Sequence, residues 1–378
     1  MYCRRLELVD FRNFAALELD LPAGPLLVLG RNAQGKSNLL EALLALASGR
    51  GRSHRTLAEL IRTVDGAPRP FARIRAEVAA SDRATRLELV FALNPTEDGG
   101  PGRRASRRVV VDGKPRRASE LLGQLNAVHF SPDDIDLLGG APAERRRFLD
   151  VAISQVDRNY VRDLVDYGRV LSQRNALLRE LRERDDDAAG LEFWDGKLVE
   201  LGGRIVATRQ QFVGALNDSG AAAYEELAGA GESLRVEYRL VGAGEDGGLP
   251  LDLLANMRTR EIQRGQTMVG PHRDDLEMLV DGQPAAAFAS RGQQRLVVLS
   301  LRLAEMEWLG GVAGESPVLL LDDIFSELDS EHREAVIARM PKGAQVLVTA
   351  ADDAQVPEAF RSDAAVLRVR AGHADREG

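Results

Sequence analysis

The sequence predicts an α/β protein in which a lobe built around a buried sheet is interrupted by an inserted helical lobe. Short apolar runs at Leu26–Leu29, Val318–Leu321 and Gln345–Val348 are typical of buried strands in a parallel sheet. Between the first two runs, segments 160–181 and 194–215 space their apolar residues by three and four, which indicates two amphipathic helices. Strand character returns after this helical part, so the sheet lobe is split in sequence.

Four parts of the chain follow from this pattern. We expect the N-terminal part of the sheet lobe at 1–120, the helical lobe with a short hairpin at 121–265, the C-terminal part of the sheet lobe at 266–370 and a flexible tail at 371–378. The two helices of the hairpin can pack in a compact helical domain or project as an arm, and their pattern is compatible with both.

Composition indicates a cytoplasmic protein without a membrane partner. The one cysteine, Cys3, cannot form an intrachain disulfide, the N-terminus lacks the apolar core of a signal peptide, and no apolar run is long enough to span a bilayer. The formal net charge is -8, so any contact with a polyanion must be local. The basic clusters are Arg50–Arg55, Arg103–Arg108, Lys114–Arg117 and Arg145–Arg147. Each cluster is either solvated surface or a binding patch. Of the four, we favour Arg50–Arg55 as the contact with DNA.

A glycine-rich loop lies between a buried strand and a helix. It matches the pattern G-x-x-x-x-G-K-[ST] in full and consists of Gly30, Arg31, Asn32, Ala33, Gln34, Gly35, Lys36 and Ser37. Glycines let the backbone turn so that its N–H groups face phosphate oxygens, and the helix N-terminus adds a positive dipole. Lys36 suits the β- and γ-phosphates and Ser37 suits Mg²⁺, so the loop predicts binding of ATP with Mg²⁺.

A second motif consists of two acidic residues that follow the strand Val318–Leu321. Asp322 can hold Mg²⁺, and Asp323 can orient or deprotonate the attacking water. Lys36 and Asp322 are separated by 286 positions (322 minus 36), more than one compact nucleotide core needs. The nucleotide-binding lobe is therefore predicted to be split by the insertion.

A third motif, Ser290-Arg-Gly-Gln293, precedes the apolar-periodic segment Leu296–Leu309. Alone it is compatible with a simple helix cap. The order of phosphate loop, insertion, S-x-G-Q and acidic strand is that of ABC-type ATPases, and Ser326–Asp329 resembles their D-loop. In that class the S-x-G-Q segment of one protomer contacts the γ-phosphate bound by the other. The sequence thus predicts an ATP-driven head-to-head homodimer in which Lys36, Asp323 and Ser290 serve catalysis.

Beyond these motifs, nearly the whole chain resembles the RecF family of bacterial recombination mediators. The resemblance is carried by Phe11–Phe14, Phe130–Asp134, Arg145–Asp150, Gln173–Asn175 and Gly270–Asp275. It implies an ABC head like those of SMC proteins, with a helical second lobe and no long coiled coil. It also implies single- and double-stranded DNA with gaps as a partner, cooperation with RecO and RecR in loading the recombinase RecA, and roles in recombinational repair, replication restart and the SOS response.

Some features depart from the ABC pattern or have two interpretations. Thr349 stands where the switch histidine is expected, which favours slow hydrolysis used as a conformational switch, and no Q-loop glutamine is evident at 127–132. His272 is compatible with a nucleotide or DNA contact or with a structural hydrogen bond, and Arg12 with a phosphate contact or a strand cap. An SMC-like tethering ATPase is the alternative function, but it predicts hundreds of heptad residues where this chain has tens.

Overall fold

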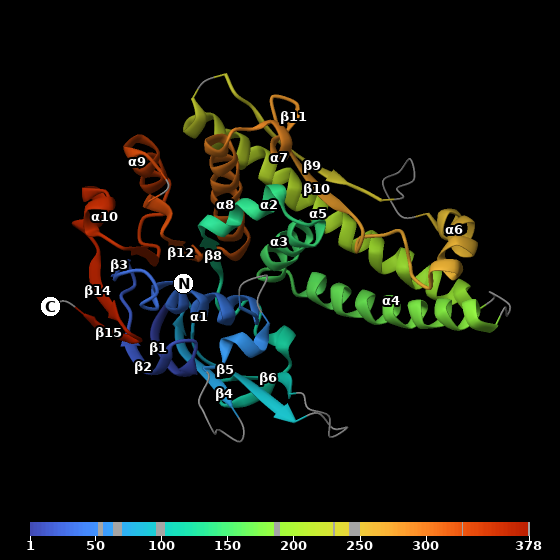
Figure 1. Ribbon diagram of the computed structural model, residues 1–378, viewed down its shortest axis with the longest axis horizontal. Helices are drawn as coiled ribbons and strands as arrows, with labels where there is room; N and C mark the ends of the chain where they lie inside the picture. Colours follow the sequence, from blue (N-terminus) through green and yellow to red (C-terminus); the bar gives the residue numbers. More distant parts are fainter. Residues whose placement is uncertain are drawn as a thin grey trace. The chain divides into compact units, whose positions relative to one another are not determined.

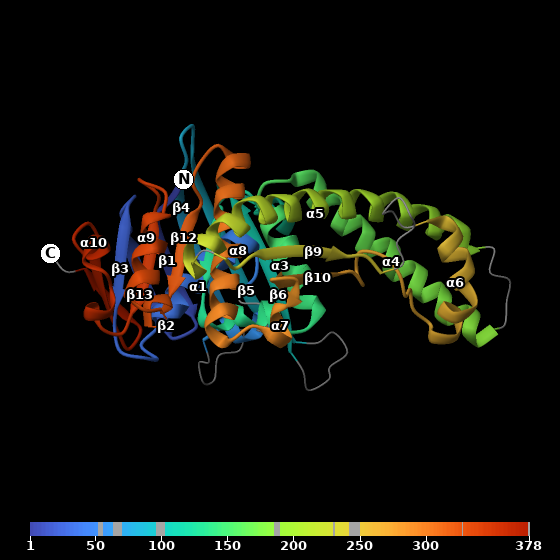
Figure 2. The same ribbon diagram turned by 90° about the horizontal axis from the view of Figure 1, so that it is seen from above.

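The computed structural model describes residues 1–51, 56–62, 70–95, 103–184, 190–229, 231–241, 250–326 and 328–376 (Figures 1 and 2). The chain forms two compact units. One consists of Met1–Asp134 with Leu299–Gly378, and the other of Ile135–Val298. The first unit is therefore discontinuous in sequence.

A six-stranded sheet of the first unit has the strand order β15-β14-β3-β13-β12-β8. Its strands are β3 (Pro25–Leu29), β8 (Ala127–Phe130), β12 (Val318–Asp322), β13 (Val346–Ala350), β14 (Ala365–Arg370) and β15 (His373–Arg376). All neighbours are parallel except β14 and β15. Since the carboxyl ends of parallel strands share one edge, the segments that follow β3, β12 and β13 lie close together.

The other sheet of the first unit is antiparallel and has the order β2-β1-β4-β5-β6-β7. Its strands are β1 (Tyr2–Phe11), β2 (Phe14–Asp20), β4 (Phe71–Ala79), β5 (Ala84–Pro95), β6 (Arg103–Val111) and β7 (Lys114–Arg116). Helix α1 (Lys36–Ser48) buries Leu39, Leu43 and Leu46 in a core that includes side chains of both sheets. The phosphate-loop helix is thus held from its apolar side by the core of the unit.

The helices of the second unit include the predicted hairpin. They are α2 (Asp136–Gly139), α3 (Pro142–Ser154), α4 (Arg158–Arg184), α5 (Leu191–Ala228), α6 (Leu251–Arg264) and α7 (Ala285–Phe288). Helices α4 and α5 lie side by side, and α6 packs against both (Figures 1 and 2). The hairpin is therefore part of a compact helical packing. None of the described helices has the length and apolarity needed to cross a membrane.

A small antiparallel sheet completes the second unit, with the order β11-β10-β9. It consists of β9 (Leu234–Arg239), β10 (Asp275–Val280) and β11 (Gln283–Pro284). Helix α8 (Arg291–Ala313) begins in this unit and ends in the first, which also contains α9 (Ser330–Ala338) and α10 (Glu358–Arg361).

The unit boundaries differ from those expected from the sequence. Residues 121–134 belong to the first unit because β8 pairs in parallel with β12, and a four-residue strand carries no readable periodicity. Residues 266–298 belong to the second unit because β10 pairs with β9 and β11. In the segment predicted as a flexible tail, His373–Arg376 forms β15 against β14, with Ala374 opposite Val369.

Candidate nucleotide site

The phosphate loop requires glycine at two positions. A Cβ at Gly30 would lie 2.4 Å from the carbonyl oxygen of Val369. Gly35 has φ 119°, and a Cβ there would lie 2.6 Å from Nδ2 of Asn13. Glycine is therefore required at both positions because other parts of the chain leave no room for a side chain. At Gly35 the left-handed backbone conformation is a second reason.

Four predicted side chains meet at the start of α1. Ser37 Oγ donates to Asp322 Oδ1 at 2.8 Å, and Lys36 Nζ donates to the carbonyl oxygen of Gly30 at 2.6 Å. Burial lowers the pKa of Lys36, and the carboxylates of Asp323 and Asp322 oppose this shift. A pocket of about 290 Å³ is lined by Asn32, Ala33, Gly35, Lys36, Ser37, Asn38, Asp322 and Asp323.

Thr349 connects the two acidic residues, a role that the sequence interpretation missed. Its Oγ1 donates to Asp322 Oδ1 at 2.8 Å and accepts from the backbone N–H of Asp323 at 2.9 Å. Asp323 has φ 52°, so this hydrogen bond holds a left-handed residue at the strand end. The available signal was the position of Thr349 at the end of β13, since β13 pairs with β12 at Asp322.

The phosphate loop is braced from two directions that are remote in sequence. Asn13 Nδ2 donates to the carbonyl oxygen of Gln34 at 2.8 Å, and Asn38 Nδ2 donates to Asn13 Oδ1 at 2.9 Å. The backbone N–H of Ala371 donates to Gln34 Oε1 at 2.7 Å, and that of Gly372 donates to the Gln34 carbonyl at 3.2 Å. Gln34 is thus a structural anchor of the loop.

The remaining loop residues and Arg12 lie differently. Arg31, Asn32 and Ala33 are exposed at the tip of the loop. Arg12 forms a bidentate pair with Glu41, in which Nε and Nη2 donate to the two carboxylate oxygens at 2.8 Å each. In this arrangement Arg12 does not line the pocket at Lys36 and Ser37.

The side chains present suit a phosphate chain and a hard cation. Gly35 has no side chain to cap α1, so the N–H groups of the first turn face the pocket with the helix dipole behind them. A hydroxyl from Ser37 and carboxylates from Asp322 and Asp323 are oxygen donors of the kind that Mg²⁺ prefers. The pocket can therefore bind a nucleotide phosphate with a divalent cation.

Ser290 immediately precedes α8 in the second unit. Its Oγ accepts from the backbone N–H of Gln293 at 3.2 Å, and Gln293 Oε1 accepts from the backbone N–H of Ser290 at 2.9 Å. These two hydrogen bonds form a capping box, so Ser290 does cap α8, as the helix-cap interpretation of this motif predicts. Ser290 and Gly292 are nevertheless exposed, and the side chain of nearby Phe288 is 69 % exposed. The helix start is thus both capped and accessible.

The segment that resembles a D-loop follows the acidic pair directly. Ser326 Oγ donates to the carbonyl oxygen of Asp323 at 2.8 Å, which ties this segment to the end of β12. Asp329 caps α9 by accepting from the backbone N–H of His332 at 3.0 Å. Glu327 lies outside the described residues.

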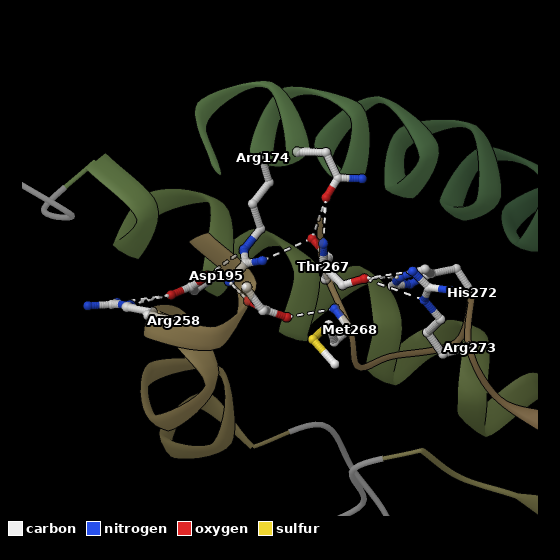
Figure 3. Close-up of polar contacts among 9 residues, drawn as sticks. Arg174, Asp195, Arg258, Thr267, Met268, His272 and Arg273 are labelled. Carbon is white, nitrogen blue, oxygen red and sulfur yellow. Dashed lines mark hydrogen bonds and ion pairs between the residues drawn. The ribbon is translucent and has the colours of Figure 1, made fainter. Parts of the chain in front are cut away.

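Two of the motifs from the middle of the chain meet in a buried cluster of the second unit (Figure 3). Arg174 has no exposed side-chain surface; it pairs with Asp195 and Glu261 at 2.7 Å each and donates to Thr267 Oγ1 at 2.9 Å. Asn175 Oδ1 accepts from the backbone N–H of Thr267 at 2.7 Å. The triplet Gln173–Asn175 therefore fixes the segment that leads into Gly270–Asp275.

His272 forms structural hydrogen bonds within the second unit, which is one of the two roles that the sequence allowed for it. Its Nδ1 lies 2.7 Å from the hydroxyl of Tyr167 and its Nε2 lies 3.3 Å from the carbonyl oxygen of Thr267. Burial lowers the pKa of His272 to about 4, so the ring is neutral at pH 7. Figure 3 shows His272 and Arg273 both directed toward the backbone of Thr267.

The fourth basic cluster is occupied by structural contacts. Arg145 forms a bidentate pair with Asp275 at 2.7 and 2.8 Å, and Arg146 donates to the carbonyl oxygen of Asp274 at 2.8 Å. Of the first cluster, Arg50 is exposed, while Arg52, His54 and Arg55 lie outside the described residues.

The fold and the site together define a class. A parallel-sheet lobe has a phosphate loop facing an acidic strand end, and a second lobe carries S-x-G-Q at a helix start, which is the arrangement of ABC-type ATPase heads. The family model described as RecF/RecN/SMC N terminal domain matches residues 2–374. The chain belongs to this family and, within it, to the RecF proteins.

The similar proteins cover nearly the full length. A "DNA replication and repair protein RecF" from Chloroflexus aurantiacus is 42% identical and aligns with 93% of this chain and 94% of its own. One from Roseiflexus castenholzii is 40% identical, with 99% of each chain covered. A structure of "the recombination mediator protein RecF-ATP in RecFOR pathway" has a TM-score of 0.86 at 31% identity and covers 100% of this chain and 98% of that one. A Smc head domain from Pyrococcus furiosus, with a TM-score of 0.53 at 16% identity over 100% of this chain and 96% of that one, shares the fold.

Proposed function

We propose that the chain is an ATP-dependent DNA-binding protein of recombinational repair. The observation that carries this proposal is the near full-length similarity of the chain to RecF proteins, including one solved as RecF-ATP. In this proposal Gly30 to Ser37 bind the phosphates of ATP, with Lys36 at the β- and γ-phosphates. Ser37 and Asp322 hold Mg²⁺, which neutralises charge on the phosphates. Asp323 orients or deprotonates the attacking water.

ATP acts as a switch for head-to-head dimerisation in this proposal. Ser290 at the exposed start of α8 meets the γ-phosphate held by a second copy of the chain. Thr349 is uncharged and is already engaged by Asp322 and Asp323, which supports slow hydrolysis.

The DNA-bound dimer recognises gapped or single-strand-containing DNA and, with RecO- and RecR-type mediators, helps to load recombinase. Recombinational repair, replication restart and the SOS response follow from that activity. The tethering alternative finds less support, since α4 and α5 have 27 and 38 residues and pack with α6.

The direct test is binding to gapped duplex DNA with and without ATP. We expect ATP to increase the affinity for gapped DNA, because two joined heads contact more phosphates than one. A gel-shift titration compares gapped duplex, intact duplex and single strand with ATP, ADP or no nucleotide. A nucleotide-binding protein without a DNA function would retain ATP and shift none of these.

Substituting Asp323 by Asn separates ATP binding from hydrolysis. We expect Asp323→Asn to bind ATP but to hydrolyse it at least about 100-fold more slowly, because the amide cannot accept the proton of the water. Its ATP-bound dimers should therefore last longer. Asn tolerates the φ of 52° at this position, so the strand end is preserved.

Hydrolysis is measured as phosphate release, and dimer lifetime by size-exclusion chromatography after an ATP pulse. Asp363→Asn, an exposed carboxylate of the same unit, is the matched control and should behave as the parent. An Asp323→Asn protein that binds ATP normally and remains monomeric would contradict the assigned role.

A further inference from the structure

One stretch of the chain is strongly basic although the whole chain is acidic. Seven of the fifteen residues from 103 to 117 are Lys or Arg, and one, Asp112, is acidic, in a chain with a formal net charge of -8. Asp112 is engaged at its own turn, where Oδ1 accepts from the backbone N–H of Arg86 at 2.9 Å. Such a concentration of one sign requires an explanation other than general solubility.

The structure places this stretch at the border of the antiparallel sheet. Strands β6 and β7 form a hairpin, and β7 is the last strand of the order β2-β1-β4-β5-β6-β7. Arg104 and Arg108 are exposed on the same face of β6, four residues or about 13 Å apart along the strand. Lys114, Arg116 and Arg117 follow on and after β7 and are exposed as well. Lys114 and Arg116 lie opposite Val111 and Val109, on the other face of the hairpin from Arg104 and Arg108, so the cations flank its edge on both sides.

A second basic segment, remote in sequence, reaches the same border. Arg107 donates from Nη1 to the carbonyl oxygen of Gly49, the residue that ends α1. Arg50 is the next residue in the chain, and burial and then the charge of Arg50 lower the pKa of Arg107. We call Arg50, Arg104, Arg108, Lys114, Arg116 and Arg117 the basic edge.

Carboxylates neutralise only part of the basic edge. Glu88 pairs with Arg108 and Glu120 with Arg116, each at 3.3 Å. The side chains of Arg50, Arg104, Lys114 and Arg117 form no ion pair within the part of the chain that the structure describes. Holding like charges together without carboxylates costs free energy that a bound polyanion would remove.

We propose that the basic edge binds the sugar–phosphate backbone of duplex DNA; this inference rests on the proposed function for its choice of polyanion. The 13 Å between Arg104 and Arg108 corresponds to about four base-pair rises of 3.4 Å, so the two cations can meet phosphates about four positions apart along a duplex. Neither β6 nor β7 contains an aromatic residue on which unpaired bases could stack, which favours a duplex over a single strand.

The test neutralises three cations of the basic edge that pair with no carboxylate among the described residues. We expect Arg104→Gln/Lys114→Gln/Arg117→Gln to weaken duplex binding about 100-fold near 0.1 M salt and to lower the slope of log Kd against log salt by about 2.7, or 0.9 for each phosphate contact. Fluorescence anisotropy with a labelled 30-base-pair duplex and a single strand of equal length measures both quantities. ATP affinity and the melting temperature should be unchanged, since the three residues are exposed.

A matched control loses three positive charges elsewhere. Arg5→Gln/Arg86→Gln/Arg235→Gln removes arginines that already pair with Glu18, Glu77 and Glu237, and its duplex affinity should equal that of the parent. Equal weakening in the two triple variants would reduce the effect to net charge and overturn the inference. Parent-like duplex binding by the basic-edge variant would overturn it while leaving the proposed function intact. A parent protein that binds no DNA would instead contradict the proposed function.

Discussion

Ser290→Arg is expected to abolish ATP-driven dimerisation and to slow hydrolysis at least about 100-fold, while ATP affinity stays near that of the parent. Lys36 and Ser37 hold the phosphates within one chain, so a monomer does not need Ser290 to bind ATP. A bulky guanidinium would occupy the place where a hydroxyl meets the γ-phosphate across the dimer. Light scattering with and without ATP, fluorescent-nucleotide titration and phosphate release measure the three quantities.

Loss of the helix cap must be separated from loss of the dimer contact. Ser290→Ala removes the hydroxyl that accepts from Gln293, at about 1 kcal/mol, but adds no bulk or charge. If Ser290 were only a cap, the Ala and Arg variants would behave alike. Mixing Ser290→Arg with Lys36→Arg creates heterodimers with one site that carries both lesions and one that carries neither, so part of the hydrolysis should return. A Ser290→Arg protein that dimerises and hydrolyses ATP like the parent would refute the head-to-head arrangement.

Arg174→Ala should destabilise the second unit by about 3–5 kcal/mol, because it leaves the buried carboxylate of Glu261 without its cation. Glu261 has no exposed side-chain surface and loses its partner, whereas Asp195 keeps Arg258 at 2.9 Å. The loss of the hydrogen bond to Thr267 also loosens the segment that leads into Gly270–Asp275. Urea unfolding followed by circular dichroism, with the α-helical signal dominated by this unit, measures the change.

Two further variants test whether the loss of stability in Arg174→Ala comes from the unpaired buried charge. Arg204→Ala removes a half-exposed arginine that pairs with Asp163 and Glu200 on the same hairpin, and it should cost at most about 1 kcal/mol. Adding Glu261→Gln to Arg174→Ala removes the unpaired charge and should recover about 1–3 kcal/mol. The amide keeps an oxygen for the backbone N–H of Met268, which Glu261 Oε1 accepts at 2.7 Å. A cost below about 1 kcal/mol for Arg174→Ala would show that the buried ion pairs contribute little to stability.

The sequence was sufficient where structure follows from neighbouring residues. The phosphate loop could be predicted because a buried strand, two glycines and a helix start are contiguous, and each residue type has a local physical reason. The buried strands β3, β12 and β13 and the paired helices α4 and α5 could likewise be predicted from their apolar patterns. These patterns, together with the order of the motifs, determined the fold class.

Tertiary structure alone decided which distant residues meet. Thr349 appeared in the sequence only as a missing histidine, yet the pairing of β13 with β12 places its hydroxyl between Asp322 and Asp323. The predicted tail instead supplies Ala371 and Gly372 as donors to Gln34.

The basic clusters show the same division between sequence and fold. The sequence favoured the Arg50–Arg55 cluster for DNA and could not separate the others, but in the structure Arg145 is paired with Asp275, while Arg107 contacts Gly49 beside Arg50 at the border of a sheet. Periodicity and propensity are properties of a short window of chain. Hydrogen bonds and ion pairs between residues hundreds of positions apart depend on strand order and register, which the fold as a whole determines.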